Sequence, residues 1–344
     1  MTSKSTSSTH VTTRRRLLRL ATLAAAASAV SLLTTAAPVQ AQASDTSYPE
    51  RPIRLVIPFG PGGETDIFAR AISGRLGEVL GQPVVVENRP GATGLVACEL
   101  VAQARPDGYT LIFGTAATHA LNHSVFKSLP YHPLDSFEPV AFVGSVPLVL
   151  YAHPSMPDNL KDFVALLKAH PEKYAYGSAG MSTSHLGVEL FKASASVKAL
   201  NVPYKGTGLA LQDLVAGQVQ FMGGSVGVGL PMVQAGKLRA LGVMSRQRLG
   251  AAPDVPTFAE AGLPDLEVGT WNVVMAPKGT PSPVVEQLNR AINEVLREPA
   301  IHSKLESLGI IPVVDSSPAS TADTIGREID KWAKAFEISG AQRQ

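Results

Sequence analysis

The feature that most constrains the fold is an alternation of strand-like and helix-like segments. Residues 53–59, 83–88 and 109–114 are short runs rich in β-branched and apolar side chains. Between the first two, residues 66–80 carry an apolar residue at every fourth position, which is the spacing of one helix face. A second helix is expected at 93–104. This βαβαβ order predicts an α/β fold, with a parallel sheet covered by helices on both faces.

The same alternation continues along the chain. Further strands are expected at 174–178, 201–205, 218–222 and 238–244. Further helices are expected at about 159–169, 184–195, 207–216 and 227–235. Two more helices should follow the Ser-Pro pairs at Ser282 and Ser317, because these pairs are typical helix starts.

Two similar apolar runs indicate how the chain is divided. Residues 146–157 and 270–281 each read as a strand that enters a Pro-containing turn and is followed by a helix. Chance similarity is the alternative, but we interpret them as two crossover strands that join two lobes. The first lobe would then be discontinuous, residues 48–149 and 268–344, and the second would span 150–267. We expect doubly wound lobes hinged near 146–151 and 269–274.

The N-terminal residues differ from the rest of the chain. Residues 1–43 hold five Lys and Arg and no acid, and an apolar run at 17–33 follows the arginine cluster. With the small-x-small sequence Ala41–Ala43, this layout predicts a signal peptide cleaved near that point and a periplasmic location. The arginines resemble a twin-arginine export signal, and general secretion is the alternative route. An uncleaved membrane anchor is the less favoured interpretation.

Charge and composition then exclude several classes of protein. The whole chain has a net charge of +2, but after residue 43 there are 25 Lys and Arg against 28 acids, a net charge of −3. A mildly acidic body argues against nucleic-acid partners, which favour a basic stripe. No later segment has 18 consecutive apolar residues, so the processed protein is not expected to be embedded in a membrane. The single cysteine, Cys98, lies in an apolar helical pattern and is expected to be buried.

The most informative loop is the sequence PFGPGGETD at 58–66. A strand ends there, glycines including Gly62 and Gly63 make a tight turn, and Thr65 and Asp66 are placed to cap a helix. Free N–H groups at a helix start attract anions. The loop has neither the Lys of a phosphate-binding loop nor the third Gly of a dinucleotide fingerprint. It therefore favours a carboxylate over a phosphate, and a purely structural turn is the alternative.

A second loop follows the third strand and includes Thr115, Thr118 and His119. Loops at the carboxyl ends of parallel strands meet at one edge of the sheet, so this loop is expected beside residues 58–66. His119 and His123 have the i,i+4 spacing of a metal pair, but no third ligand is apparent, and neither a metal nor a cofactor is expected.

The second lobe offers its own hydroxyl-rich loop at 177–187. Ser182, Thr183 and Ser184 are placed to cap a helix and present donors, with His185 in its first turn. At the end of another strand, Tyr204 is placed to wall a pocket and Lys205 either to pair with an acid or to extend into solvent. A simple helix cap is the alternative for the serines. Two donor-rich lobes predict a clamp around a small anion.

One motif favours an enzyme instead. Residues 223–227 fit G-x-S-x-G after a strand, which would make Ser225 a nucleophile, with Asp254 or Asp265 and His302 downstream. This secreted serine hydrolase remains an alternative. It is not favoured, because His302 lies in a helical segment and no oxyanion motif is present, so no catalytic residue is assigned.

Several segments in one order resemble a known family. They are YPERPIRLVIPFGPGGETD (48–66), QPVVVENRPGA (82–92), PDGYTL (106–111), VPYKG (202–206), AGKLRALGV (235–243) and DVPTFAEAGLP (254–264). Together they resemble the solute receptors of tripartite tricarboxylate transporters, the Bordetella-uptake-gene (Bug) family. The resemblance covers residues 48–340. It implies a type II periplasmic-binding-protein-like fold without catalysis, which closes like a flytrap on an organic-acid carboxylate and hands it to the transporter's membrane subunits. A receptor that reports to a membrane sensor is the alternative.

The resemblance also implies ligand contacts. Carried over by motif, these are Gly62, Gly63, Thr65, Asp66, Thr115, Thr118, His119, Ser178, Ser182, Thr183, Ser184, His185, Tyr204 and Lys205. We add Glu64 and Ser225 to this candidate set.

Three departures from the family pattern concern the same region. Glu64 stands where the family often has a small residue, Gly223-Gly224 replaces a common Phe-Asp, and the 177–187 loop is one residue shorter. The site thus gains an acid in the first lobe and loses one in the second. We expect Glu64 either to face solvent or to meet a polar or cationic part of the ligand.

Overall fold

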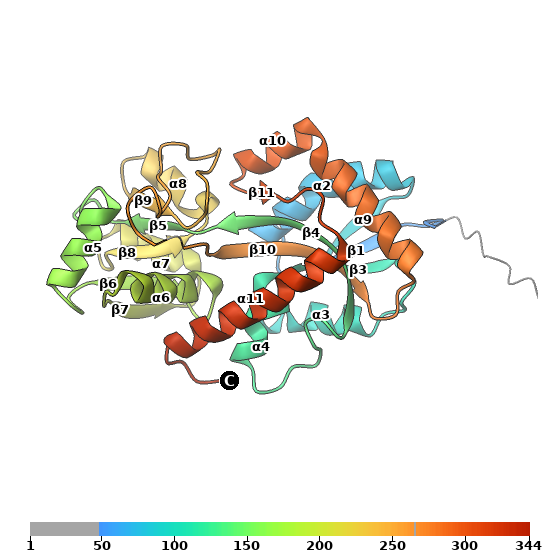
Figure 1. The fold of residues 1–344 in the computed structure, drawn as a ribbon, viewed down its shortest axis with the longest axis horizontal. Helices are drawn as coiled ribbons and strands as arrows, with labels where there is room; N and C mark the ends of the chain where they lie inside the picture. The colour runs from blue at the N-terminus through green and yellow to red at the C-terminus, as the bar shows by residue number, and fades with distance from the viewer. Residues whose placement is uncertain (1–47, 265) are drawn as a thin grey trace, which may run out of the picture. The chain divides into compact units, whose positions relative to one another are not determined.

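The strand-like runs pair into two separate β-sheets that the chain enters and leaves in turn (Figure 1). The computed structural model describes residues 48–264 and 266–344. The predicted signal peptide, residues 1–43, lies outside the described residues.

The first sheet has the strand order β11-β4-β10-β3-β1-β2. Its strands are β1 (Ile53–Ile57), β2 (Val84–Asn88), β3 (Thr110–Thr115), β4 (Phe137–Pro147), β10 (Gly269–Pro277) and β11 (Ile311–Pro312). β1 pairs in parallel with β2 and β3, as the βαβαβ order predicts. The other pairings are antiparallel, so the sheet is mixed and only its βαβαβ part is parallel. The reason is that β10 brings the chain back from the second sheet, and it runs against both of its neighbours.

The second sheet has the order β7-β6-β8-β5-β9. Its strands are β5 (Val149–Ala152), β6 (Ala175–Ala179), β7 (Leu200–Tyr204), β8 (Phe221–Gly224) and β9 (Arg239–Val243). β6 is parallel to β7 and β8, whereas β5 is antiparallel to β8 and β9. β8 starts later than the expected 218–222 and includes two glycines, because Gly223 and Gly224 pair with Leu150 and Val149 of β5.

The helices fall close to their expected positions. They are α2 (Glu64–Leu80), α3 (Leu95–Ala102), α4 (Asn122–Val125), α5 (Leu160–Ala169), α6 (Thr183–Ala195), α7 (Thr207–Val215), α8 (Val226–Gln234), α9 (Ser282–Arg297), α10 (Pro299–Ser307) and α11 (Pro318–Ile338), with the short helical segments η1 (Ala92–Gly94) and η2 (Ala117–Leu121). The single helix expected at 93–104 is divided, because Thr93 and Gly94 have φ of 54° and 91°, and only Gly adopts such angles readily. Cys98 of α3 is buried, as predicted.

Two crossings join the sheets at one place. Leu148, between β4 and β5, donates its N–H to Val268 O at 2.9 Å, just before β10 begins. Met244, just after β9, donates to Leu148 O at 2.8 Å, and Val268 donates to Met244 O at 3.0 Å. The crossing segments are therefore held together by backbone hydrogen bonds. The lobe boundaries at 149/150 and 267/268 remain a prediction.

The helix α11 crosses the region between the sheets. Figure 1 shows it in front of β4 and β10, and it packs on β4, η2, α4 and, from the second lobe, α6. Its Trp332 is completely buried. Among residues 48–264 and 266–344, no helix is both long and apolar enough to cross a membrane.

Candidate functional site

The start of α2 has no side-chain cap. Its N-cap residue is Gly63, whose φ of −76° and ψ of 165° are extended, and no side chain accepts a hydrogen bond from the first turn. The first N–H groups of a helix have no acceptor within the helix, so they are available as hydrogen-bond donors at its start. Gly62 precedes them with φ of 78°, a left-handed angle that favours glycine. Gly62 and Gly63 are both exposed, as a ligand-contacting turn requires.

Asp66 holds this glycine loop in shape. Its buried carboxylate accepts hydrogen bonds from Gly62 N–H at 2.9 Å, from Arg70 Nε at 2.9 Å and from Asn88 Nδ2 at 3.0 Å. Asn88, at the end of β2, also donates to Phe59 O at 3.0 Å. Burial alone would raise the pKa of Asp66, but these donors outweigh it and hold the pKa below its usual value. Asp66 thus positions the loop, and with Thr65 it is almost fully buried.

Three loops meet at the carboxyl edge of the first sheet. Gly94 packs so closely that an added Cβ would lie 2.5 Å from Thr118 Cγ2 and 3.0 Å from Pro58 Cβ. Asn122 Nδ2 donates to Thr93 O at 3.2 Å. The structure therefore brings the 58–66 loop and the 115–119 loop together, as expected, with η1 between them.

The predicted ligand contacts of the 115–119 loop have side chains that are almost completely buried in the protein. Thr115 N–H donates to Thr118 Oγ1 at 2.9 Å, and these two side chains are 2% and 0% exposed. His119 is 0% exposed, with its ring 5.0 Å from that of Phe137 and its Nδ1 2.9 Å from Thr118 Oγ1. The structure thus places His119 in the core, and its predicted ligand contact stays a prediction.

The burial of His119 also makes the stability of the folded protein depend on pH. Desolvation lowers the pKa of its imidazole to about 3. The unfolded chain takes up this proton near pH 6.5 and the folded protein does not, so stability falls as the pH drops below 6.5. At pH 5 we expect His119 to cost about 2 kcal/mol of stability relative to pH 7. Urea unfolding at both pH values should show this loss in the wild type and a smaller loss in His119→Gln; equal losses would contradict it.

In the second lobe, the hydroxyl-rich loop caps α6. Ser182 is the N-cap, its Oγ accepts from His185 N–H at 3.3 Å, and it lies 2.9 Å from Ser184 Oγ. Thr183 and Ser184 are half-buried at the helix start. The capping prediction is confirmed, and the ligand role of these three side chains stays a prediction.

A polar network that joins buried side chains to the exposed Asn201 lies next to this loop. Ser178 Oγ donates to Asn201 Oδ1 at 2.7 Å, and the Asn201 amide lies 3.2 Å from His185 Nε2. The same ring approaches Glu189, which accepts from Tyr176 and from Lys192. Burial lowers the pKa of His185, and Glu189 only partly opposes this. Sequence reasoning missed Glu189, although it lies i,i+4 from His185 on α6.

Tyr204 and Lys205 lie at the end of β7, where the loop to α7 begins. Tyr204 OH donates to Asp213 Oδ2 at 2.7 Å, so its hydroxyl is tied to α7. Lys205 is exposed. α7 has Gly206 as N-cap and no side-chain cap, so it resembles α2 in this respect.

One contact links the lobes directly. The hydroxyl of Ser225, the N-cap of α8, lies near enough to the carboxyl of Glu64, the first residue of α2, to lower the pKa of that carboxyl. Burial raises the pKa of Glu64 to about 7, and the Ser225 hydroxyl partly opposes this. Nearby, an added Cβ on Gly309, after α10, would lie 2.7 Å from Val226 Cβ, so the two lobes touch here. Glu64 is half-buried, and the expectation that it faces solvent or meets a polar or cationic part of the ligand stays a prediction.

The enzyme and metal alternatives gain no support from this geometry. His302, the histidine that a hydrolase would need, lies on α10 and pairs with Glu306. The ring centroids of His123 and His132 are 5.4 Å apart, whereas His119 is buried in the core. In the described part of the chain, no three His, Cys, Asp or Glu side chains are arranged to hold a metal ion.

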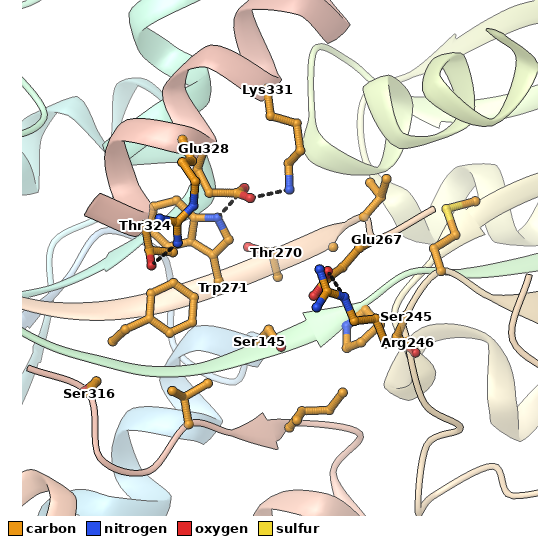
Figure 2. A pocket seen from close by; sticks show the side chains of 18 of the residues that line it. Ser145, Ser245, Arg246, Glu267, Thr270, Trp271, Ser316, Thr324, Glu328 and Lys331 are labelled. Carbon is orange, nitrogen blue, oxygen red and sulfur yellow. Dashed lines mark hydrogen bonds and ion pairs between the residues drawn. The ribbon is translucent and has the colours of Figure 1, made fainter. Parts of the chain in front are cut away.

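A cavity of about 830 Å³ lies beside the crossing strands. It is lined by β4, β10, the segment after β9 and α11, and no predicted site residue lines it. Figure 2 shows two of its charged groups: Trp271 and Lys331 point toward Glu328, and Arg246 pairs with Glu267. We call it the hinge groove.

Glu328 in the hinge groove ties α11 to β10. Its carboxylate accepts from Trp271 Nε1 at 2.7 Å and from Trp332 Nε1 at 3.0 Å, and it pairs with Lys331. Hydrogen bonds to a charged group contribute about 1.5–3 kcal/mol each, and both indoles are buried. We expect Glu328→Ala to lower the free energy of unfolding by about 2–4 kcal/mol in guanidinium titrations. Glu337→Ala, near the end of the same helix on its exposed side, is the control; equal losses would contradict this role.

The fold and the site together define a class, the two-lobed solute-binding receptors, and comparison with known proteins identifies the family. Residues 68–340 match the model of the tripartite tricarboxylate transporter family receptors. The chain is 38% identical to protein BugT of Bordetella pertussis over 316 residues, which cover 91% of this chain and 97% of BugT. The chain therefore belongs to this receptor family, as its motifs predict.

Solved structures agree with this assignment. MatC from Rhodopseudomonas palustris, solved with bound malate, is 36% identical with a TM-score of 0.70, covering 84% of this chain and 99% of MatC. A second R. palustris protein, solved with adipate, is also 36% identical, with a TM-score of 0.75 and coverages of 86% and 100%. The predicted periplasmic-binding-protein-like fold, two α/β lobes joined by crossover strands, is confirmed by such likenesses.

Proposed function

We propose that this chain captures a small organic acid between its lobes and delivers it to the membrane subunits of a tripartite tricarboxylate transporter. The observation that carries the proposal is the placement of helix starts without side-chain caps. α2 comes from the first lobe and α7 and α8 from the second, and all three follow a strand end. The Ser225 hydroxyl lies near enough to Glu64 to lower the pKa of its carboxyl, which supports the proximity of the α2 and α8 starts.

Such an arrangement suits a carboxylate. Helix starts combine free N–H donors with the positive end of the helix dipole. Micromolar binding needs about 8 kcal/mol, and charge-assisted hydrogen bonds contribute about 1.5–3 kcal/mol each, so four or five donors suffice after ordering costs. The two R. palustris relatives were solved with carboxylic acids, malate and adipate, which supports the same ligand class.

Binding would close the lobes about the crossings. We place the hinge near 146–151 and 269–274, where Leu148, Met244 and Val268 are joined by backbone hydrogen bonds. The periplasm follows as the site of action, with removal of the leader near Ala41–Ala43. We propose no catalytic step.

A thermal-shift screen of the processed chain tests the proposal. Mono- and dicarboxylates, amino acids and aromatic acids are added at concentrations well above the expected dissociation constant. An acid present at 100 times its dissociation constant adds about 2.7 kcal/mol, which for a chain of this size raises the melting temperature by several degrees. Absence of a shift with every class, in protein shown to be folded and free of ligand, would contradict the proposal.

A further inference from the structure

The hinge groove has a polar part and an apolar part, and none of the predicted site residues lines it. Its volume of about 830 Å³ is within the range of about 300–1,000 Å³ that is typical of small-molecule sites. The polar part is one face of α11, formed by Ser320, Thr324, Arg327, Glu328 and Lys331. Figure 2 shows three of these side chains, those of Thr324, Glu328 and Lys331, on the helix above the crossing strands.

The apolar part of the groove leaves several side chains open to solvent. Phe142 of β4, Ile311 of β11 and the following Val313 are partly exposed, and Val314 is 36% exposed. The ring of Phe142 packs next to that of Trp271, with centroids 5.6 Å apart. Covering such side chains with a hydrocarbon group removes apolar surface from water, which is favourable. This part of the groove is therefore suited to the hydrocarbon part of a ligand.

The charged groups of the groove leave one cation without a carboxylate. The acids that line it are all paired, in the ion pairs Glu328–Lys331, Glu267–Arg246 and Asp315–Arg297. Arg327 donates from Nη2 to Thr324 Oγ1 at 3.0 Å, and no carboxylate of the described part of the chain pairs with it. A guanidinium has five N–H donors in a planar fork that fits a carboxylate. One unpaired arginine predicts one anionic group on the ligand.

A buried hydroxyl group of the groove also lacks a partner. Ser316 lines the groove directly before the N-cap of α11, and its backbone O accepts from the side chains of Asn289 and Asn293 at 2.7 and 2.9 Å. Its Oγ is buried and has no hydrogen-bond partner among the described residues. An unsatisfied buried hydroxyl is costly, so an acceptor supplied by a ligand would be favourable. The guanidinium of Arg327 reaches back to Thr324, toward the same end of α11.

From these observations we propose that the hinge groove is a second binding site, for an amphipathic monocarboxylate. Arg327 binds the carboxylate, and the exposed apolar side chains contact the hydrocarbon part. A second carboxylate would lie near the acids of the groove itself, so dicarboxylates are disfavoured. The inference does not rest on the proposed function, because the groove shares no residue with the predicted site.

Probes that differ in one feature test this site, by isothermal titration calorimetry of the processed chain near neutral pH. 4-Phenylbutyrate and octanoate have both features, whereas 4-phenylbutanol lacks the charge and butyrate lacks most of the hydrocarbon. We expect the wild type to bind at least one of the two amphipathic acids about 10-fold or more tightly than either of the other probes. Arg327→Gln should weaken binding of that acid by about 10-fold or more, the loss expected for a charge-assisted hydrogen bond. Val314→Asn, which makes an apolar wall polar, should weaken it by about 3-fold or more.

The matched control is Lys334→Gln, which removes an exposed charge from α11 outside the groove and should leave the affinity unchanged. Failure of the folded wild type to bind either acid at up to about 10 mM would overturn the inference. An unchanged affinity in Arg327→Gln or in Val314→Asn would place the acid elsewhere and also overturn it, as would equal losses in Arg327→Gln and Lys334→Gln. None of these outcomes affects the proposed function, which is tested by acids whose binding is the same in Arg327→Gln and in the wild type.

Discussion

Replacing Asp66 by Ala should strongly weaken acid binding and destabilise the protein, because Asp66 holds the glycine loop in shape. Its carboxylate joins the Gly62 N–H, Arg70 and Asn88, and Asn88 in turn holds Phe59 O. Without it, the glycine loop loses the contact that fixes its left-handed turn. The N–H donors at the start of α2 would then become ordered only when the acid binds, and the free-energy cost of this ordering would lower the affinity.

We expect an affinity loss of about 100-fold or more, equivalent to about 3 kcal/mol, and a loss of about 2–4 kcal/mol in the free energy of unfolding. Calorimetry and urea titration measure the two quantities on the same preparation. Asp66→Asn is the matched control, because it keeps an acceptor for the Gly62 N–H and should lose less of both. Unchanged affinity in Asp66→Ala would show that the loop does not depend on this clamp.

The second large effect is expected at Gly269, where β10 begins. A Cβ at this position would lie 2.3 Å from Val146 O and 2.8 Å from Pro147 Cα. Both neighbours are backbone atoms of β4, which is held to β10 by its ladder, so neither can move aside cheaply. We expect Gly269→Ala to lower the free energy of unfolding by about 3 kcal/mol or more, as for a severe overpacking change.

Gly326→Ala is the matched control for Gly269→Ala. Gly326 lies inside α11, and no atom lies within 4 Å of an added Cβ. Alanine is the better helix former, so this change should stabilise the protein by about 0.5–1 kcal/mol. Guanidinium unfolding of both variants provides the comparison. Similar stability of the two would show that the crossing strands tolerate a side chain at Gly269.

Local sequence patterns predict much of this fold. The βαβαβ segment can be predicted from the spacing of its apolar residues alone. The predicted bounds of β1, α2, β2 and β3 lie within a few residues of the observed ones. The strand β4 is less visible, because Pro139, Gly144 and Pro147 interrupt its pattern and it includes bulges against β10. Its direction, and that of β10, depends on the path of the chain between the sheets.

The candidate site is predictable in part for the same reason. Glycine and hydroxyl residues at strand ends mark the loops, and the structure brings 58–66 and 115–119 together as expected. Glu64 and Ser225 are far apart in sequence and belong to different lobes, so no local pattern predicts that they lie near each other. The position of His119 in the loop predicts a ligand contact, and local sequence does not show that its ring packs on Phe137 in the core.

A crystal structure of the processed chain with a bound acid tests the central claim most directly. The account predicts the ligand carboxylate at the start of α2, within hydrogen-bond distance of the N–H groups of Gly63–Thr65, with the second lobe closed over it and Ser225 at its far end. A carboxylate bound instead in the hinge groove, beside Trp271 and Lys331, with the α2 start open to solvent, would contradict it.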